Sequence, residues 1–254
     1  IIYYKWRNRL MELEFKNKTI LITGATRGIG KQIAHDLEFL GAKLLLTGTK
    51  SKEIIELNEK AKLEQSKRKY FHLDILDKKS LKKFILEINR IDIIHGLINN
   101  AGINRLNKIQ DSKDNDWDEM IDVNLTAPYK LIKAVAKNMI REKYGRIVNI
   151  GSIFGKISKE KRSIYSATKF GIHGLTVGSS NDLAKHNILV NTLSPGFILT
   201  ELTENNLSAK EINQLKNEIP LKKLGSTKDI SKIVIFLMSD LNLYITGQNI
   251  IADG

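Results

Sequence analysis

The sequence predicts an α/β fold: one doubly wound domain with a seven-stranded, mostly parallel sheet flanked by helices on both faces. Short apolar runs alternate with longer amphipathic segments along the 254 residues, which is the pattern of successive βαβ units. The runs are apolar at consecutive positions, so the strands are expected to be buried on both faces. A glycine-rich turn joins the first run to the first helical pattern. Right-handed crossovers then place helices on each side of the sheet.

The apolar runs and the amphipathic segments define the expected elements in order. The expected strands span residues 19–23, 43–47, 70–73, 93–98, 146–150, 188–193 and 249–251. The expected helices lie near residues 30–40, 52–63, 78–89, 115–140, 163–185 and 227–239. No linker or repeat divides the chain, so residues 15–254 are expected to form one domain. Residues 1–14 are expected to be an N-terminal extension, either native or an expression remnant.

Composition excludes several kinds of chemistry. The chain has no cysteine, which rules out disulfides and thiolate catalysis. Its five histidines are scattered and form no metal-binding motif, so no metal site is expected. No apolar run reaches the roughly 20 residues that span a bilayer. The net charge of +13 comes from lysines spread over the whole chain, so we expect no nucleic-acid partner and keep acidic substrates open.

The glycine-rich turn reads Thr23-Gly24-Ala25-Thr26-Arg27-Gly28-Ile29-Gly30. Glycine permits a tight turn and a close approach of the backbone to a pyrophosphate, while the following helix offers unpaired N–H groups to the anion. The alternative is a plain strand-to-helix turn, because a glycine triplet alone is weak evidence. Gly24, Thr26, Arg27, Gly28, Ile29 and Gly30 are therefore the candidate phosphate-binding residues.

The end of the second strand indicates which dinucleotide is preferred. Folds that prefer NAD place an acidic residue here to hold the ribose 2′-hydroxyl, whereas this chain has Thr47-Gly48-Thr49-Lys50. With Arg27 in the glycine turn, Thr49 and Lys50 offer a 2′-phosphate positive charge and a hydroxyl donor. The cofactor is therefore predicted to be NADP(H), although Lys50 could equally be a solvated loop residue.

Tyr165 and Lys169 lie four residues apart in an expected helix, which places them on one face. An ammonium group beside a phenol favours the phenolate, and this turns a weak acid into a proton-transfer group. The pair alone occurs often by chance. Ser152 strengthens the hypothesis because it follows the fifth expected strand, at the sheet edge where sites form, although a turn or cap serine is the alternative.

Together these motifs resemble the short-chain dehydrogenase/reductase family, single-domain type, which has a Rossmann-type fold. The resemblance runs from about Lys18 to Gly254. Its motifs occur in the family's order: the glycine turn at 23–30, Asp74 after the third strand, Asn99-Asn100-Ala101-Gly102, Asn124, Ser152, Tyr165 with Lys169, and Pro195-Gly196 with Thr200. The resemblance implies one dinucleotide-binding and catalytic domain.

The resemblance also implies a role for each matching residue. Tyr165 would protonate a carbonyl oxygen as hydride reaches the carbon, Lys169 would assist it and bind the nicotinamide ribose, Ser152 would orient the carbonyl, and Asn124 would hold a relay water. The remaining cofactor contacts would be Asp74 and Ile75 at the adenine, Asn100, Ala101 and Gly102 at the adjoining ribose, and Pro195, Gly196, Ile198 and Thr200 at the nicotinamide. The last four residues would also begin a mobile substrate lid, which would include roughly residues 200–220.

The substrate is predicted less directly. The chain is similar to bacterial 3-oxoacyl-acyl-carrier-protein reductases, with Arg162 where that branch usually has Gln and Asn181 where it usually has a basic residue. Arg162 is the candidate substrate-binding residue besides Ser152, because the segment before Tyr165 also carries Lys156, Lys159 and Lys161. An anionic carbonyl compound is expected, small or carried by a protein. The alternatives are an anionic sugar or polyol oxidoreductase and a non-catalytic NADP-binding sensor. The resemblance implies a cytoplasmic homotetramer.

Overall fold

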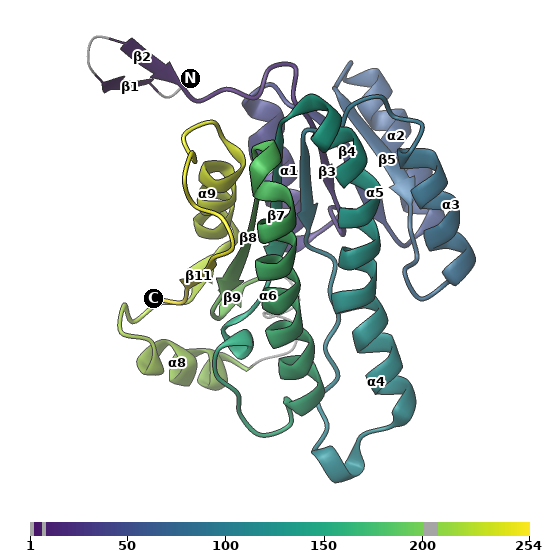
Figure 1. Cartoon of the computed structure of the whole chain (residues 1–254). Coiled ribbons are helices and arrows are strands. Elements are labelled where there is room, and N and C mark those ends of the chain that lie inside the picture. Colours follow the sequence, from purple (N-terminus) through teal and green to yellow (C-terminus); the bar gives the residue numbers. More distant parts are fainter. Residues whose placement is uncertain (1–2, 7–8, 201–207) are drawn as a thin grey trace.

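Figure 1 shows the computed structural model of the chain, which describes residues 3–6, 9–200 and 208–254. Its centre is one seven-stranded sheet in which every neighbouring pair of strands is parallel. From one edge to the other the strands are β5 (Arg68–His72), β4 (Lys43–Gly48), β3 (Thr19–Ile22), β6 (Gly96–Asn99), β7 (Gly145–Ile150), β8 (Ile188–Pro195) and β11 (Asn249–Ala252). The predicted fold class is confirmed, and the sheet is wholly parallel.

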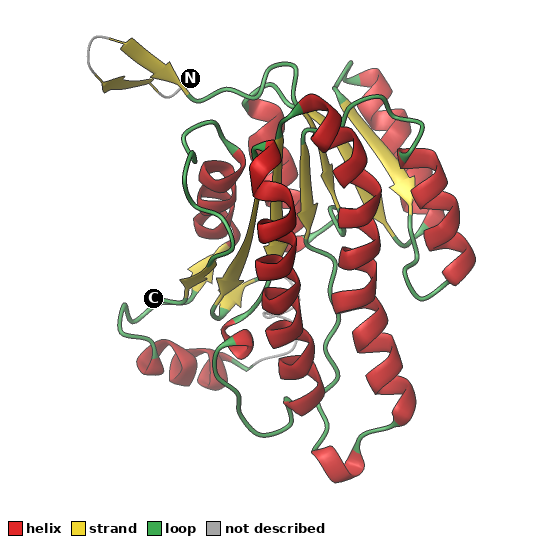
Figure 2. Ribbon diagram, viewed as in Figure 1, coloured by secondary structure: helices red, strands yellow, loops and turns green. Residues whose placement is uncertain are grey.

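Helices cover both faces of the sheet, as Figure 2 shows in red around the yellow strands. One face packs against α1 (Gly28–Phe39), α2 (Ser51–Leu63) and α9 (Thr227–Met238). The other packs against α3 (Lys78–Ile88), α5 (Ala127–Glu142) and α6 (Ser163–Leu183). Along β3, Ile20 and Ile22 join the first core cluster and Leu21 joins the second. This alternation explains why the strand sequence is apolar at every position.

The strand order reverses between β3 and β6, which are neighbours in the sheet although β4 and β5 intervene in sequence. In open parallel sheets the crevice at such a reversal, beyond the carboxyl ends of the strands, is where ligands bind. The segments that leave this edge are the glycine turn after β3, residues 100–102 after β6 and residues 151–152 after β7. They carry the predicted phosphate-binding residues of the glycine turn, together with Asn100, Ala101, Gly102 and Ser152.

Two predicted elements differ in detail. The strand expected at 93–98 is β6 (Gly96–Asn99), because Ile94 is buried in the core before the ladder begins. The helix expected at 115–140 consists of α4 (Asp114–Ile121), a π-helical turn η2 (Asp122–Thr126) and α5. Pro128 has no N–H to donate to the carbonyl of residue 124, and its ring crowds that carbonyl, which accounts for the widened turn.

Smaller elements complete the fold. Short helical turns lie at η1 (Ile109–Asp111), η3 (Ile153–Gly155) and η4 (Ala184–His186). Strands β1 (Tyr3–Trp6) and β2 (Arg9–Glu12) pair with each other and stand apart from the main sheet (Figure 1). Strands β9 (Ile198–Leu199) and β10 (Gly225–Ser226) form a parallel pair, and α8 (Ala209–Glu218) lies between them in sequence. Residues 201–207 of the expected lid lie outside the described residues.

No helix in the described ranges has the length and apolarity to cross a bilayer.

Candidate active site

The glycine turn has a backbone conformation and a packing that favour glycine. Gly24 and Gly28 have φ of +63° and +56°, in the left-handed region that L side chains rarely adopt. A Cβ on Gly30 would lie 2.4 Å from the carbonyl oxygen of Gly24. Helix α1 begins at Gly28, and the side chain of its N-cap residue, Arg27, makes no capping hydrogen bond. The first N–H groups of α1 are therefore open to an anion.

Side-chain hydrogen bonds tie the glycine turn to the loop after β6. Thr23 Oγ1 accepts from the backbone N–H groups of Asn100 and Ala101, each at 3.0 Å. Asn100 Nδ2 donates to the carbonyl oxygens of Thr23 and Gly24, each at 2.9 Å. The two loops on either side of the strand-order reversal are thereby fixed as one unit.

The loops after β4 and β5 form the neighbouring part of this edge. Thr47 Oγ1 accepts from Gly24 N at 3.2 Å, which joins β4 to the glycine turn. Thr49 and Lys50 lead into α2, and no acidic residue lies between positions 47 and 50. Beyond β5, Asp74 Oδ1 accepts from Leu76 N at 3.0 Å, so this carboxylate shapes its own turn around Ile75.

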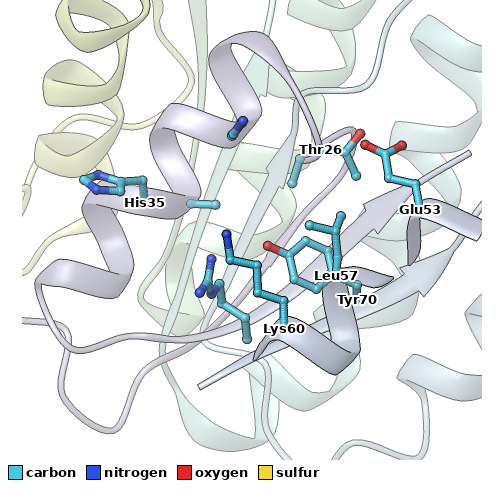
Figure 3. Close-up of a pocket in the computed structure, with 10 residues that line it drawn as sticks. Thr26, His35, Glu53, Leu57, Lys60 and Tyr70 are labelled. Carbon is cyan, nitrogen blue, oxygen red and sulfur yellow. The ribbon is translucent and has the colours of Figure 1, made fainter. Parts of the chain in front are cut away.

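A separate pocket opens between α1, α2 and β5 (Figure 3). Thr26 is the only predicted site residue in its lining. Its cationic side chains include Lys31 and Lys60, while Glu53 contributes a carboxylate. The pocket adjoins the glycine turn on the α1 and α2 side of the sheet, whereas Tyr165 and Lys169 lie on α6, which packs on the opposite face.

The predicted proton-transfer pair comes together on α6. Lys169 is buried, and its Nζ lies 5.5 Å from the centre of the Tyr165 ring. The same Nζ donates to the carbonyl oxygen of Ile150 at 2.9 Å, where β7 ends two residues before Ser152. A Cβ on Gly102 would lie 3.8 Å from this Nζ. The ammonium therefore lies among the phenol, the β7 end and the loop after β6.

Asn124 lies in the π-helical turn, and its side-chain amide faces the loop after β6 and α6. Its Oδ1 accepts from Ile103 N at 2.9 Å, and its Nδ2 donates to Ile103 O at 2.9 Å and to Thr168 Oγ1 at 3.1 Å. Thr168 directly precedes Lys169. The fully buried amide thus ties the loop after β6 to the part of α6 that carries the ammonium.

Ser152 begins the turn η3 beside α6. Its Oγ accepts from Phe154 N at 3.2 Å. The ring of Phe154 meets the ring of Tyr165 edge to face, with centroids 6.3 Å apart. The guanidinium carbon of Arg162 lies 4.9 Å from the centre of the Phe154 ring. Tyr165 and Lys169 are in direct contact, whereas Ser152 and Arg162 are linked to Tyr165 through Phe154 and Asn124 is linked to Lys169 through Thr168.

The predicted nicotinamide-side residues follow β8. Gly196 N donates to Ala252 O at 2.9 Å, and a Cβ on Gly196 would lie 2.7 Å from the Cα of Asp253. Pro195 ends β8 in register with Ala252, while Ile198 begins β9 and Thr200 follows it. The C-terminal strand β11 thus holds this loop at the same sheet edge.

Sequence reasoning missed a buried polar chain beneath the site. Asn99 Nδ2 donates to Asn149 Oδ1 at 2.8 Å, Asn149 Nδ2 donates to Thr176 Oγ1 at 2.8 Å, and the hydroxyls of Thr176 and Thr192 are 2.7 Å apart. This chain crosses from β6 through β7 and α6 to β8. The sequence signal for this chain is the presence of polar residues inside otherwise apolar runs. A polar side chain buried in a strand costs free energy unless it has a hydrogen-bond partner, so such residues are expected to bond to one another.

The fold and this site define a dinucleotide-dependent oxidoreductase of the doubly wound α/β class. Residues 18–211 match the family model described as short chain dehydrogenase, and the chain belongs to this family. It is 37% identical over 252 residues to the 3-oxoacyl-[acyl-carrier-protein] reductase FabG of Aquifex aeolicus, covering 96% of this chain and 99% of that protein. The FabG of Haemophilus influenzae is 37% identical over 240 residues, covering 94% and 98%.

Solved structures agree with the family. A gluconate 5-dehydrogenase from Burkholderia cenocepacia in complex with NADP and tartrate superposes with a TM-score of 0.88 at 29% identity, covering 95% of this chain and 96% of that one. The structure described as ElxO with NADP bound gives a TM-score of 0.86 at 29% identity, covering 93% and 97%. The predicted family resemblance is confirmed.

Proposed function

We propose that the protein reduces a carbonyl to an alcohol with NADP(H), or catalyses the reverse, as an enzyme of the 3-oxoacyl-acyl-carrier-protein reductase type. The observation that carries this proposal is the placement of Lys169, whose Nζ lies beside the Tyr165 ring and bonds to the end of β7, two residues before Ser152. The names of the relatives at 37% identity support the substrate class.

The residues present suit an NADP(H) cofactor. The close packing of the turn at Gly30, the open N-terminus of α1 and the uncapped start of α2 suit binding of a pyrophosphate and an adjoining 2′-phosphate. Arg27, Thr49 and Lys50 would bind the 2′-phosphate, since no carboxylate at the β4 end would repel it. Asp74 and Ile75 would border the adenine, and residues 100–102 the ribose. Two structural neighbours are described as bound to NADP.

In this mechanism the chain handles the proton. NADPH, when bound, supplies hydride to the carbonyl carbon. Ser152 would orient the carbonyl oxygen, and Tyr165 would donate the proton to that oxygen as its charge develops. Lys169 would hold the nicotinamide ribose and favour proton transfer from the phenol. Asn124 would hold the water that returns a proton toward Lys169. Pro195, Gly196, Ile198 and Thr200 would line the nicotinamide.

Arg162 would face the negatively charged part of the substrate. Its guanidinium is partly buried, and no carboxylate among the described residues pairs with it. Burial lowers the pKa of Arg162, with opposition from the nearby Tyr165 phenol. A partly desolvated cation without an acidic partner gains most from an anionic ligand.

The test measures NADPH oxidation by the purified protein with acetoacetyl-acyl-carrier protein, acetoacetyl-CoA, 5-ketogluconate and a neutral ketone. We expect turnover of the acetoacetyl thioesters and a loss of at least a hundredfold in kcat for Tyr165→Phe with NADPH binding retained. NADPH binding without turnover of any carbonyl compound would favour a non-catalytic sensor.

A second candidate function is oxidoreduction of an anionic sugar or polyol. The TM-score of 0.88 with a gluconate 5-dehydrogenase favours it, as does the unpaired guanidinium near Tyr165. In the same assay, a kcat/KM for 5-ketogluconate above that for acetoacetyl thioesters would select this function.

We also propose a cytoplasmic homotetramer in which residues 15–254 form the catalytic unit. Helices α5 and α6 expose Tyr129 and Phe170, each about half accessible, and Gly174 and Gly178 on α6 have nothing near their Cβ positions. Such a surface suits close helix packing between subunits. Light scattering is expected to give a tetramer, and Phe170→Glu is expected to dissociate it; a wild-type monomer would refute the assembly.

A further inference from the structure

Phe154 is the residue at which the candidate active site contacts its basic loop. Its ring is 5% exposed and meets Tyr165 at a centroid distance of 6.3 Å with an interplanar angle of 68°. It meets Phe197 at 6.3 Å and 82°. The Arg162 guanidinium carbon lies 4.9 Å from its centre. One apolar side chain thus contacts the predicted proton donor, the predicted anion ligand and the loop after β8.

The backbone on both sides of Phe154 is fixed. Its N–H donates to Ser152 Oγ at 3.2 Å, and Gly155 N donates to Ser152 O at 2.8 Å. A Cβ on Gly155 would lie 2.6 Å from the carbonyl oxygen of Lys169, so the turn lies directly against α6. The ring therefore has a defined place relative to Ser152 and Lys169, and it is a rigid support for Arg162.

The aromatic face explains how Arg162 stays near Tyr165 without a carboxylate partner. A guanidinium over an aromatic face is attracted by the ring quadrupole, and more strongly where water is excluded. A guanidinium stacked on a ring keeps the N–H donors at its edge available, whereas a carboxylate partner would occupy them. Lys159 repeats the arrangement nearby, with Nζ 5.5 Å from the centre of the Phe197 ring.

We propose that Phe154 is a positioning residue that holds the Arg162 guanidinium beside Tyr165, with its N–H donors directed to a phosphate or carboxylate of the substrate. The inference rests on the proposed reduction of an anionic carbonyl compound. Phe154 itself touches no reacting atom; it acts through Arg162. It makes the enzyme selective for charged substrates over neutral ones with the same reacting carbonyl.

The experiment compares two substrates that share a 3-oxo group, the phosphate-bearing acetoacetyl-CoA and the neutral ethyl acetoacetate. The readout is the ratio of their kcat/KM values in Phe154→Leu, Arg162→Met and the double variant. The ratio removes any effect on Tyr165 that both substrates share. We expect each single variant to lower the ratio about five- to tenfold, and the double variant to lower it no further, because both changes remove one interaction. Phe154→Tyr, which keeps the ring, is expected to retain the ratio.

Phe71 provides a matched control. It is also buried, meets Phe84 edge to face at 5.7 Å and 69°, and has Lys69 Nζ 5.0 Å from its ring centre. It lies on β5, away from α6. Phe71→Leu is expected to lower stability as Phe154→Leu does and to leave the substrate ratio unchanged.

The outcomes separate this inference from the function on which it rests. If Arg162→Met lowers the ratio and Phe154→Leu does not, the positioning role is wrong and the anion contact stands. If Arg162→Met leaves the ratio unchanged, the anion contact itself is wrong. If wild type turns over neither compound, the proposed reduction of 3-oxo substrates is wrong. If Phe154→Leu does not fold, Phe154→Met conserves volume without a ring, and the same results are expected of it.

Discussion

Lys169 Nζ donates to the carbonyl oxygen of Ile150 at 2.9 Å, so the ammonium of this α6 residue is held at the end of the strand that leads to Ser152. This bond sets where the ammonium lies relative to the Tyr165 ring. Lys169→Met is expected to lower kcat by about a hundred- to ten-thousandfold, because proton transfer loses its cation. Steady-state kinetics checks this, with far-UV circular dichroism to confirm folding. Lys185→Met, at an exposed position just after α6, serves as control, and equal activity in both variants would contradict the assignment.

Asn124→Ala is expected to destabilise the protein by about 2–4 kcal/mol, since three hydrogen bonds to Ile103 and Thr168 are lost and the backbone groups of Ile103 stay partly buried. Chemical denaturation measures the change. Asn138→Ala on α5 removes a single amide bond, to Ile91 O at 3.1 Å, and is expected to cost about 1 kcal/mol. Equal losses in the two variants would count against a special structural role for the π-helical turn.

Gly30→Ala is expected to weaken NADPH binding by at least a hundredfold. The added Cβ would lie 2.4 Å from Gly24 O and 2.5 Å from Asn100 Nδ2, so the glycine turn and the loop after β6 must separate. Fluorescence titration with NADPH measures the affinity. Lys83→Ala, at an exposed position on α3, is the control; an unchanged affinity in Gly30→Ala would show that the turn does not bind the cofactor.

His95 makes stability depend on pH. Its Nδ1 accepts from Thr19 N at 3.0 Å, which requires an unprotonated nitrogen. Burial, followed by the charge of Lys18, lowers the pKa of His95 below its value in the unfolded chain, and Glu142 opposes this shift. The unfolded chain therefore takes up the proton first, so this contribution to stability is complete above about pH 6.5 and is lost as pH falls below it.

Denaturation midpoints measured between about pH 7 and pH 5 test this dependence. His95→Asn, which keeps an acceptor and cannot be protonated, is expected to flatten the decrease. An unchanged pH dependence in that variant would assign the decrease to other groups.

Much of the fold follows from sequence because the physical signals are local. Runs such as that of β3 are apolar at every position and mark strands buried on both faces, and the glycine turn marks where the first helix begins. The start of β6 was predicted too early because Ile94 is apolar and buried although it precedes the strand. A sequence does not distinguish a buried residue in a strand from a buried residue in the loop before it. The π-helical turn was not predicted. A proline within a helical pattern can be accommodated by a kink, a break or a widened turn, and the sequence does not distinguish these.

For the candidate site, the sequence indicated a set of residues but not the contacts between them. Tyr165, Lys169, Ser152 and Asn124 are recognisable from motif order. In the structure Lys169 lies beside Tyr165, while Asn124 and Ser152 reach the pair through Thr168 and Phe154. Phe154 is a single aromatic residue with no motif of its own, and its importance arises from which rings and cations surround it. The chain from Asn99 to Thr192 likewise depends on pairings across four elements that no local pattern specifies.

The short parallel pair β9 and β10 brings together two points of the chain separated by 25 residues, with Ile198 opposite Gly225 and Gly225 N donating to Phe197 O at 3.0 Å. The segment between Leu199 and Gly225 therefore begins and ends at the same strand pair. Because closing a longer loop costs little once its ends are held together, this interval can lengthen or shorten while the sheet and α6 stay where they are. The substrate lid proposed for residues 200–220 can therefore vary in length independently of the sheet.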